Sequence, residues 1–149
     1  MLKRIAILVL LLLGAHLNLT ALVPAAAGQA PPPWWVGGGV LWPFFADTAT
    51  LLPAGGIRDL LTPILGITAA VCLLLAACAL LGRVVPWSWF RGLTVAGAVM
   101  SLLLQMVWIS GWAILPIAVD GALLWLVFAR HLNVGRLGKR ASLSAGDAQ

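Results

Sequence analysis

The chain has 149 residues, of which 62% are hydrophobic and only 9% are charged, and its mean hydropathy is +1.07. A soluble domain of this length cannot bury so many apolar side chains, so the composition excludes a soluble fold. The net charge of +5 does not indicate a nucleic-acid-binding protein, because the basic residues stand at the ends of apolar segments and not in one patch.

Three segments contain no Asp, Glu, Lys or Arg: residues 5–46, 60–82 and 92–119. Since a helix needs roughly 20 apolar residues to cross a bilayer, they predict at least three transmembrane helices. Apart from Asp120, the last segment stays uncharged to residue 129, and one helix over 92–129 would be about 57 Å long, nearly twice the hydrocarbon thickness. We therefore expect it to cross twice, which makes the predicted fold an all-α bundle of four transmembrane helices.

The first predicted helix covers residues 5–23 and ends before Pro24. A cleaved signal peptide over residues 1–27 is the alternative, because two basic residues, an apolar run and an Ala-x-Ala motif at 25–27 follow one another. We favour a retained helix, since the apolar run is nearly of full transmembrane length.

Residues 28–59 form the longest predicted connection, and their many Pro and Gly residues exclude a spanning helix. Within it we expect residues 47–52 to form one short turn capped by Asp47. Aromatic side chains suit the headgroup region better than bulk water, so we expect this loop to lie on the membrane. Its aromatics are a predicted docking surface for another protein, with interfacial anchoring as the alternative: Trp34, Trp35, Trp42, Phe44 and Phe45.

The second predicted helix covers residues 60–82, with Pro63 in its first turn, where a missing N–H costs nothing. The third covers residues 92–109 and the fourth covers residues 112–130. A Ser-Gly pair between them, at residues 110–111, is the predicted point of reversal.

Basic residues divide unequally between the two sides of this bundle. Four crossings place eight of the nine on one side and Arg58 alone on the other, and an excess of Lys and Arg marks the cytoplasmic side. We predict a multi-pass protein of the cell inner membrane with both termini in the cytoplasm and a largely disordered polar tail at residues 131–149. The eight residues are Lys3, Arg4, Arg83, Arg91, Arg130, Arg136, Lys139 and Arg140.

Strongly polar side chains are rare inside the predicted helices, and their depths agree. At about 1.5 Å of rise per residue, each of the four helices contributes at least one of them to a single layer near mid-membrane. Such groups are costly in hydrocarbon, which makes them candidates for a binding site. The five residues of this predicted polar layer are His16, Asn18, Thr68, Gln105 and Asp120.

Two interpretations of the polar layer remain open. The first is helix packing, because hydrogen bonds between membrane helices fix their register. The second is a proton-handling or ligand-binding site in which His16 pairs with Asp120, since a His–Asp pair can exchange a proton near neutral pH.

We expect no cofactor or metal. A bis-histidine haem is disfavoured because His16 has no second histidine inside the membrane, and zinc lacks clustered ligands. Cys72 and Cys78 fall on different faces of one helix and predict packing residues, not a disulfide or a metal site.

Two stretches of sequence, together with the plan of four transmembrane helices, resemble those of a known group of membrane proteins. The first runs from Arg4-Ile5 through Leu13-Gly14-Ala15-His16 to Val23-Pro24, and the second is Leu115-Pro116-Ile117-Ala118-Val119-Asp120. With these, the chain resembles small bacterial four-helix membrane proteins of the DoxX-like type, although its first loop is longer than theirs. Some members of that group resemble accessory subunits of quinone-linked redox systems.

The sequence contains no catalytic motif, so we expect a non-enzymatic protein whose partners are the lipid bilayer and other membrane subunits, and whose oligomeric state is open. The leading hypothesis is an accessory or small subunit of a larger membrane assembly, because a bundle with almost no soluble domain has little besides its loop to present. The alternative is a small transporter or a proton- or quinone-handling protein that uses the polar layer.

Overall fold

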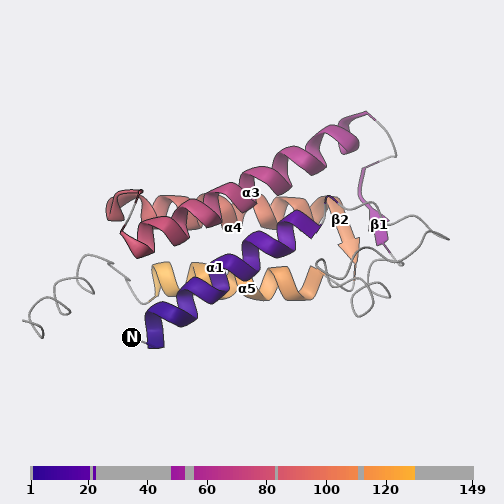
Figure 1. The fold of residues 1–149 in the computed structure, drawn as a ribbon. Helices are drawn as coiled ribbons and strands as arrows, with labels where there is room; N and C mark the ends of the chain where they lie inside the picture. The colour runs from indigo at the N-terminus through magenta and orange to yellow at the C-terminus, as the bar shows by residue number, and fades with distance from the viewer. Residues whose placement is uncertain are drawn as a thin grey trace, which may run out of the picture.

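The computed structural model describes residues 2–20, 22, 48–52, 56–82, 84–110 and 113–129. In this part of the chain four α-helices pack into a bundle (Figure 1), which confirms the number of helices predicted from the sequence. A short 3-10 turn, η2, precedes the third of them, and two strands pair at one end of the bundle. The elements are α1 (Leu2–Thr20), β1 (Thr48–Thr50), α3 (Ile57–Leu81), η2 (Trp87–Trp89), α4 (Phe90–Val107), β2 (Trp108–Ser110) and α5 (Ile114–Phe128).

Three helical segments are long and apolar enough to cross a membrane: α1, α3, and η2 together with α4. They contain 19, 25 and 21 residues. The fourth helix, α5, is also apolar but has 15 residues, which is about 22 Å at the rise of an α-helix. The bundle is therefore compatible with a membrane protein, and it contains three helices of spanning length among the described residues.

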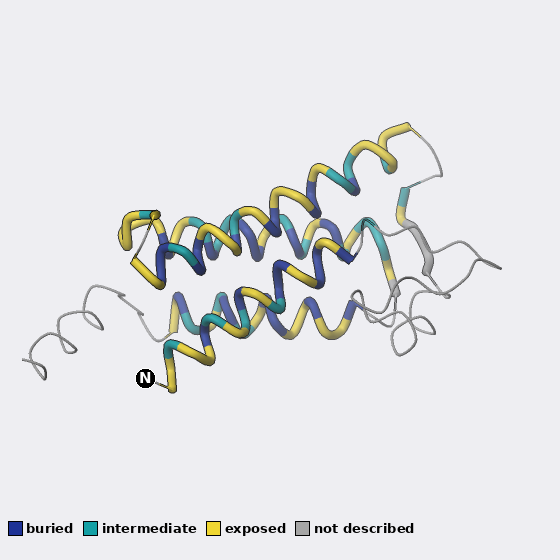
Figure 2. The backbone as a smooth tube through the Cα atoms, viewed as in Figure 1, coloured by how far each residue is buried: buried dark blue, intermediate teal, exposed yellow. Residues whose placement is uncertain are grey.

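The helices pack in the order α1, α3, α4, α5, and α1 also packs against α5. Buried residues on each helix face the other helices, and exposed residues face outward (Figure 2). Neighbouring helices run in opposite directions, so the start of α1, the η2 turn and the end of α5 lie at one end of the bundle (Figure 1). The strands β1 and β2 lie at the other end.

Three helices meet at the side chain of Leu73, which is fully buried. A Cβ atom on Gly14 of α1 would lie 3.0 Å from Leu73 Cδ1, and a Cβ atom on Gly97 of α4 would lie 2.8 Å from Leu73 Cγ. The two glycines therefore allow α1 and α4 to approach α3 closely, as small residues do where membrane helices pack.

The end of α3 depends on Gly82. This residue has a φ of +68°, and its N–H donates to the carbonyl groups of Ala79 and Cys78. Glycine adopts this left-handed conformation without steric cost. A side chain at this position would also overlap the Trp87 indole ring, so Gly82 sets the tight connection from α3 to η2.

Two local predictions are wrong. Residues 48–50, expected in a short turn, form strand β1, which pairs antiparallel with β2 through Thr48 with Ser110 and Thr50 with Trp108. The fold is therefore not purely α-helical. Pro63 does not lie in the first turn either, because α3 begins at Ile57 and the proline falls inside the helix.

Replacing Gly97 with Ala should destabilise the bundle, because the new methyl group must displace Leu73 from a filled core. Overpacking of this kind costs about 1–3 kcal/mol. The matched control is Gly92→Ala on the same helix, where nothing lies within 4 Å of the new Cβ atom. Since alanine is the better helix former, this control should keep or raise the free energy of unfolding.

Equilibrium unfolding in mixed detergent micelles, followed by circular dichroism, measures both variants. A Gly97→Ala protein as stable as the Gly92→Ala protein would contradict the close packing of α4 on Leu73.

Candidate functional site

The bundle separates the five residues of the predicted polar layer. Asn18 and Asp120 are buried, with 0% and 1% of their surface exposed. Gln105 is half-buried on α4, while His16 on α1 and Thr68 on α3 are exposed. Two of the five side chains therefore lie inside the bundle and two lie on its outer surface.

The predicted pair of His16 with Asp120 is not formed among the described residues. His16 stands two positions before the buried Asn18, and side chains two residues apart on a helix do not face each other. Because Asn18 points into the bundle, His16 points away from it.

Asp120 meets a residue that the sequence analysis did not select, Ser101 of α4. Both side chains are buried, and the Ser101 hydroxyl is the polar group that faces the carboxyl group of Asp120. Their geometry falls short of a hydrogen bond: in the part of the chain described, neither Asp120 oxygen nor the Ser101 hydroxyl has a partner. A buried polar group without partners is costly, and a charged one more so.

Other buried polar groups are satisfied within their own helix. Thr94 Oγ1 donates to the Phe90 carbonyl at 2.8 Å, and Thr20 Oγ1 bonds to its own helix in the same way. Asn18 Nδ2 donates to the Gly14 carbonyl at 2.8 Å. Such bonds back to the preceding turn need no other helix. Asn18 is nevertheless only partly satisfied, because its acceptor Oδ1 is buried without a partner among the described residues.

Asn18 lies one helix turn from the contact between α1 and α5 at Gly14. The Asn18 amide nitrogen lies against the Gly14 carbonyl, and a Cβ atom on Gly14 would lie 3.4 Å from Val119 Cγ1, in the residue before Asp120. The buried side-chain oxygen atoms that have no hydrogen-bond partner among the described residues come from three helices. They are Asn18 Oδ1 on α1, Ser101 Oγ on α4, and Asp120 Oδ1 and Oδ2 on α5.

The sequence gives a partial indication that Ser101 belongs to the site. It stands four residues before Gln105, so the two lie on neighbouring positions of one helix face. Residue type alone does not separate it from Thr94, whose hydroxyl is buried on the same helix but bonds to the backbone. Only the approach of α5 brings the Asp120 carboxyl group opposite Ser101.

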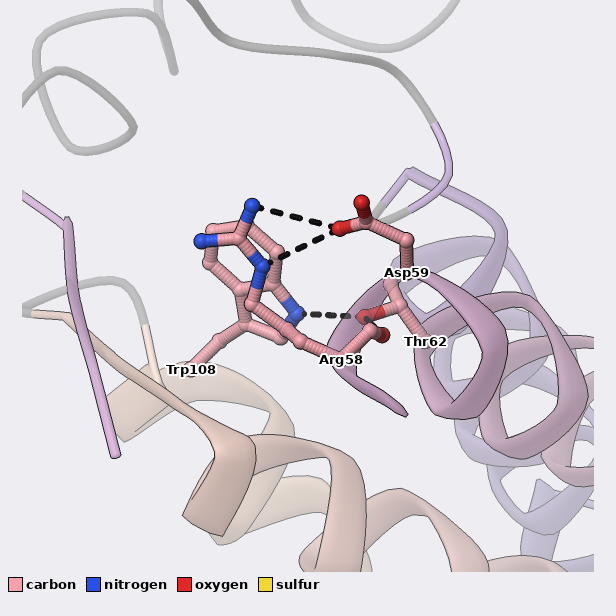
Figure 3. Close-up of polar contacts among 4 residues, drawn as sticks. All are labelled: Arg58, Asp59, Thr62 and Trp108. Atoms are coloured by element: carbon pink, nitrogen blue, oxygen red, sulfur yellow. Dashed lines mark hydrogen bonds and ion pairs between the residues drawn. The ribbon is translucent and has the colours of Figure 1, made fainter. Parts of the chain in front are cut away.

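A second polar group joins α3 to β2 at the strand-bearing end of the bundle (Figure 3). Trp108 Nε1 donates to Thr62 Oγ1 at 2.8 Å, and Thr62 Oγ1 donates to the Arg58 carbonyl at 2.9 Å. The Arg58 guanidinium group lies 5.2 Å from the centre of the Trp108 ring, and its Nε donates to Asp59 Oδ1 at 3.2 Å. Each of these side chains is engaged by another, so the group holds the elements together.

The described residues contain no group of three or more His, Cys, Asp or Glu side chains that could hold a metal ion, and in them Cys72 and Cys78 are free thiols. The predicted tail, residues 131–149, lies outside the described residues. So does the predicted docking surface, which stays a prediction: Trp34, Trp35, Trp42, Phe44 and Phe45.

Comparisons of the chain with protein-family models, with curated proteins and with solved structures give no match. The site is therefore interpreted from its own geometry.

Replacing Trp108 with Phe should loosen the strand-bearing end, because it removes the N–H that Thr62 accepts and weakens the contact with Arg58. We expect the free energy of unfolding to fall by about 1–2 kcal/mol. The control is Trp89→Phe on η2, whose side chain is 61% exposed and should tolerate the change. Equal stability of the two variants would show that the Trp108 contacts contribute nothing.

Proposed function

We propose that the chain is a four-span protein of the inner membrane, with both termini in the cytoplasm, and that it binds and releases a proton at Asp120. The arrangement of the helix ends supports the topology, because Lys3, Arg4 and Arg91 gather at the end formed by the start of α1 and by η2 (Figure 1), while Arg58 lies at the other. The fourth span is α5, whose short apolar length a locally thinner bilayer accommodates at modest cost.

The burial of the Asp120 carboxyl group without a hydrogen-bond partner in the described residues carries the functional proposal. An ionisable residue inside a membrane bundle marks an ion or proton pathway by default. The neighbouring Ser101 hydroxyl suits both of its protonation states, because a hydroxyl can donate to the charged carboxylate and accept from the protonated acid.

A role in helix packing alone is the competing interpretation. Polar residues that stabilise helix packing form hydrogen bonds from one helix to the next. In this bundle Thr94 and Asn18 instead donate to their own helices, and Asp120 has no such bond among the described residues. This pattern favours a proton site over a packing role.

The hydrophobic reagent dicyclohexylcarbodiimide tests the proposal, because it modifies protonated carboxyl groups within membranes. In nanodiscs, the wild-type protein should be labelled at Asp120, as located by peptide mass spectrometry, and labelling should fall as pH rises. The Asp120→Asn variant should fold with normal yield and lose this label. In liposomes with an imposed pH gradient, the wild type should dissipate the gradient faster than the variant does.

The packing interpretation has its own signature. Under it, Asp120→Asn lowers the folded yield, while the wild type shows neither labelling at Asp120 nor proton flux above that of empty liposomes.

An accessory subunit of a larger membrane assembly is the second candidate function. The observation that favours it is the composition of residues 28–59, which carry five aromatic side chains and three charges, and the resemblance to DoxX-like proteins points the same way. Gentle extraction followed by mass spectrometry should then recover partner proteins that are lost when the five aromatics are changed to Ala. An unchanged set of co-purifying proteins would count against docking by this loop.

A further inference from the structure

His16 is a polar side chain on the outer surface of the bundle. It is exposed on α1, and it makes no hydrogen bond or ion pair within the described part of the chain. In water this placement would cost nothing. In a chain that spans a membrane the same side chain faces hydrocarbon, where an imidazole group without a partner is costly.

Contacts between α1 and α3 fix the depth of His16. A Cβ atom on Gly14 would lie 3.0 Å from Leu73 Cδ1, and a Cβ atom on Gly66 would lie 3.2 Å from the Asn18 carbonyl oxygen. Since His16 stands midway between Gly14 and Asn18, it is level with the middle of α3, a helix of 25 residues. The middle of such a helix is about 18 Å from either end, farther than an imidazole side chain reaches. His16 therefore lies near mid-membrane.

The outward face of α1 forms one continuous stripe that contains His16. Its members are separated alternately by three and four residues, which keeps them on one side of the helix and is the spacing of the seam between paired helices. Apart from His16, every member is apolar, with 40–80% of its surface exposed. The α1 stripe consists of Leu2, Ile5, Val9, Leu12, His16 and Leu19.

The outward faces of the other three helices have less need of a partner. Their large exposed side chains are apolar, which suits contact with lipid. Thr68, exposed near the middle of α3, has a short hydroxyl group that can donate to its own backbone one turn earlier. Among the described helices, His16 is thus the outward-facing group whose partner must come from another molecule.

We infer that the α1 stripe is an interface between two copies of this chain, in which His16 of one copy hydrogen-bonds to His16 of the other. Electrostatic complementarity selects a second copy. A neutral imidazole carries one N–H donor and one acceptor nitrogen, so each finds a hydrogen-bond partner in the other. Both copies insert in the same direction, which makes their α1 helices parallel, and a two-fold axis between them sets each stripe residue beside its own copy. One polar residue in an apolar seam also fixes the register of the pair.

The charges near the α1 stripe do not oppose this pairing. Lys3 stands beside the first stripe residue at the end of the helix, where its long side chain reaches water and the repulsion between copies is screened. Asp120 is buried inside the bundle and takes no part. The inference therefore goes beyond the proposed proton site, and it shares with that proposal only the use of α1 as a membrane span.

Disulfide cross-linking in membranes tests the position of the interface. In a chain with Cys72→Ala and Cys78→Ala, the substitution Val9→Cys places a thiol in the α1 stripe, seven residues before His16. Oxidation with copper phenanthroline should convert this protein to a covalent dimer. The matched control is Val71→Cys on the outward face of α3, where the valine is 46% exposed against 55% for Val9, and it should stay monomeric. No dimer at Val9→Cys, or equal cross-linking at Val71→Cys, would overturn the assignment of the interface to α1.

Energy transfer between donor-labelled and acceptor-labelled copies in liposomes tests the role of His16, measured as the protein is diluted with lipid. His16→Leu keeps the stripe apolar but removes the hydrogen bond, and it should raise the dissociation constant of the dimer by about three- to tenfold. His16→Asn should stay close to the wild type, because an amide also carries a donor and an acceptor. Thr68→Leu on the outward face of α3 is the matched control and should leave the dissociation constant unchanged.

The outcomes separate the parts of the inference. A His16→Leu dimer as tight as the wild-type dimer would overturn the hydrogen bond between the two copies, while cross-linking at Val9→Cys, in a chain that keeps His16, decides the interface by itself. A mature protein that lacks residues 1–27, as seen by its intact mass, would overturn the whole inference. None of these measurements uses the chemistry of Asp120, so a failure of the proton site leaves them unaffected.

Discussion

The packing of Leu73 against two glycines is the contact on which the rest of the bundle depends. It holds α1 and α4 against α3 at a distance that a single added methyl group would disturb. With α1 and α4 fixed in this way, α5 packs between them and carries Asp120 to Ser101. A core contact between apolar atoms thus determines which polar groups meet, although it includes none of them.

The chemistry of the polar side chains explains why Asp120 depends on other helices. The threonine hydroxyl and the asparagine amide each carry a hydrogen-bond donor. This donor reaches a backbone carbonyl oxygen one turn earlier in the same helix. An ionised carboxylate only accepts, and inside a helix the backbone N–H groups are already used. Asp120 must therefore find a proton, a donor on another helix or a cation. This requirement supports the proposed proton site, since a bound proton meets it.

The two ends of the bundle are joined in different ways. At one end, Gly82 allows a tight turn from α3 into η2, a local device with a local signal in the sequence. At the other end, β1 pairs with β2 across about sixty residues of chain, and Trp108 reaches back to Thr62. Strands of three residues are too short to show a periodic hydrophobic pattern. Whether they form depends on the strand they pair with, which here is distant in the sequence. This is why residues 48–50 were expected in a turn.

The sequence alone determined the number of helices and their approximate ends, because hydropathy summed over about 20 positions dominates the placement of a helix. Tertiary structure decided which way each side chain points. His16 and Asn18 have similar depth, yet one is exposed and the other buried. Ser101 became part of the site for the same reason. Direction around a helix depends on which neighbours pack against it, and here the close approach at Gly14 and Gly97 sets those neighbours.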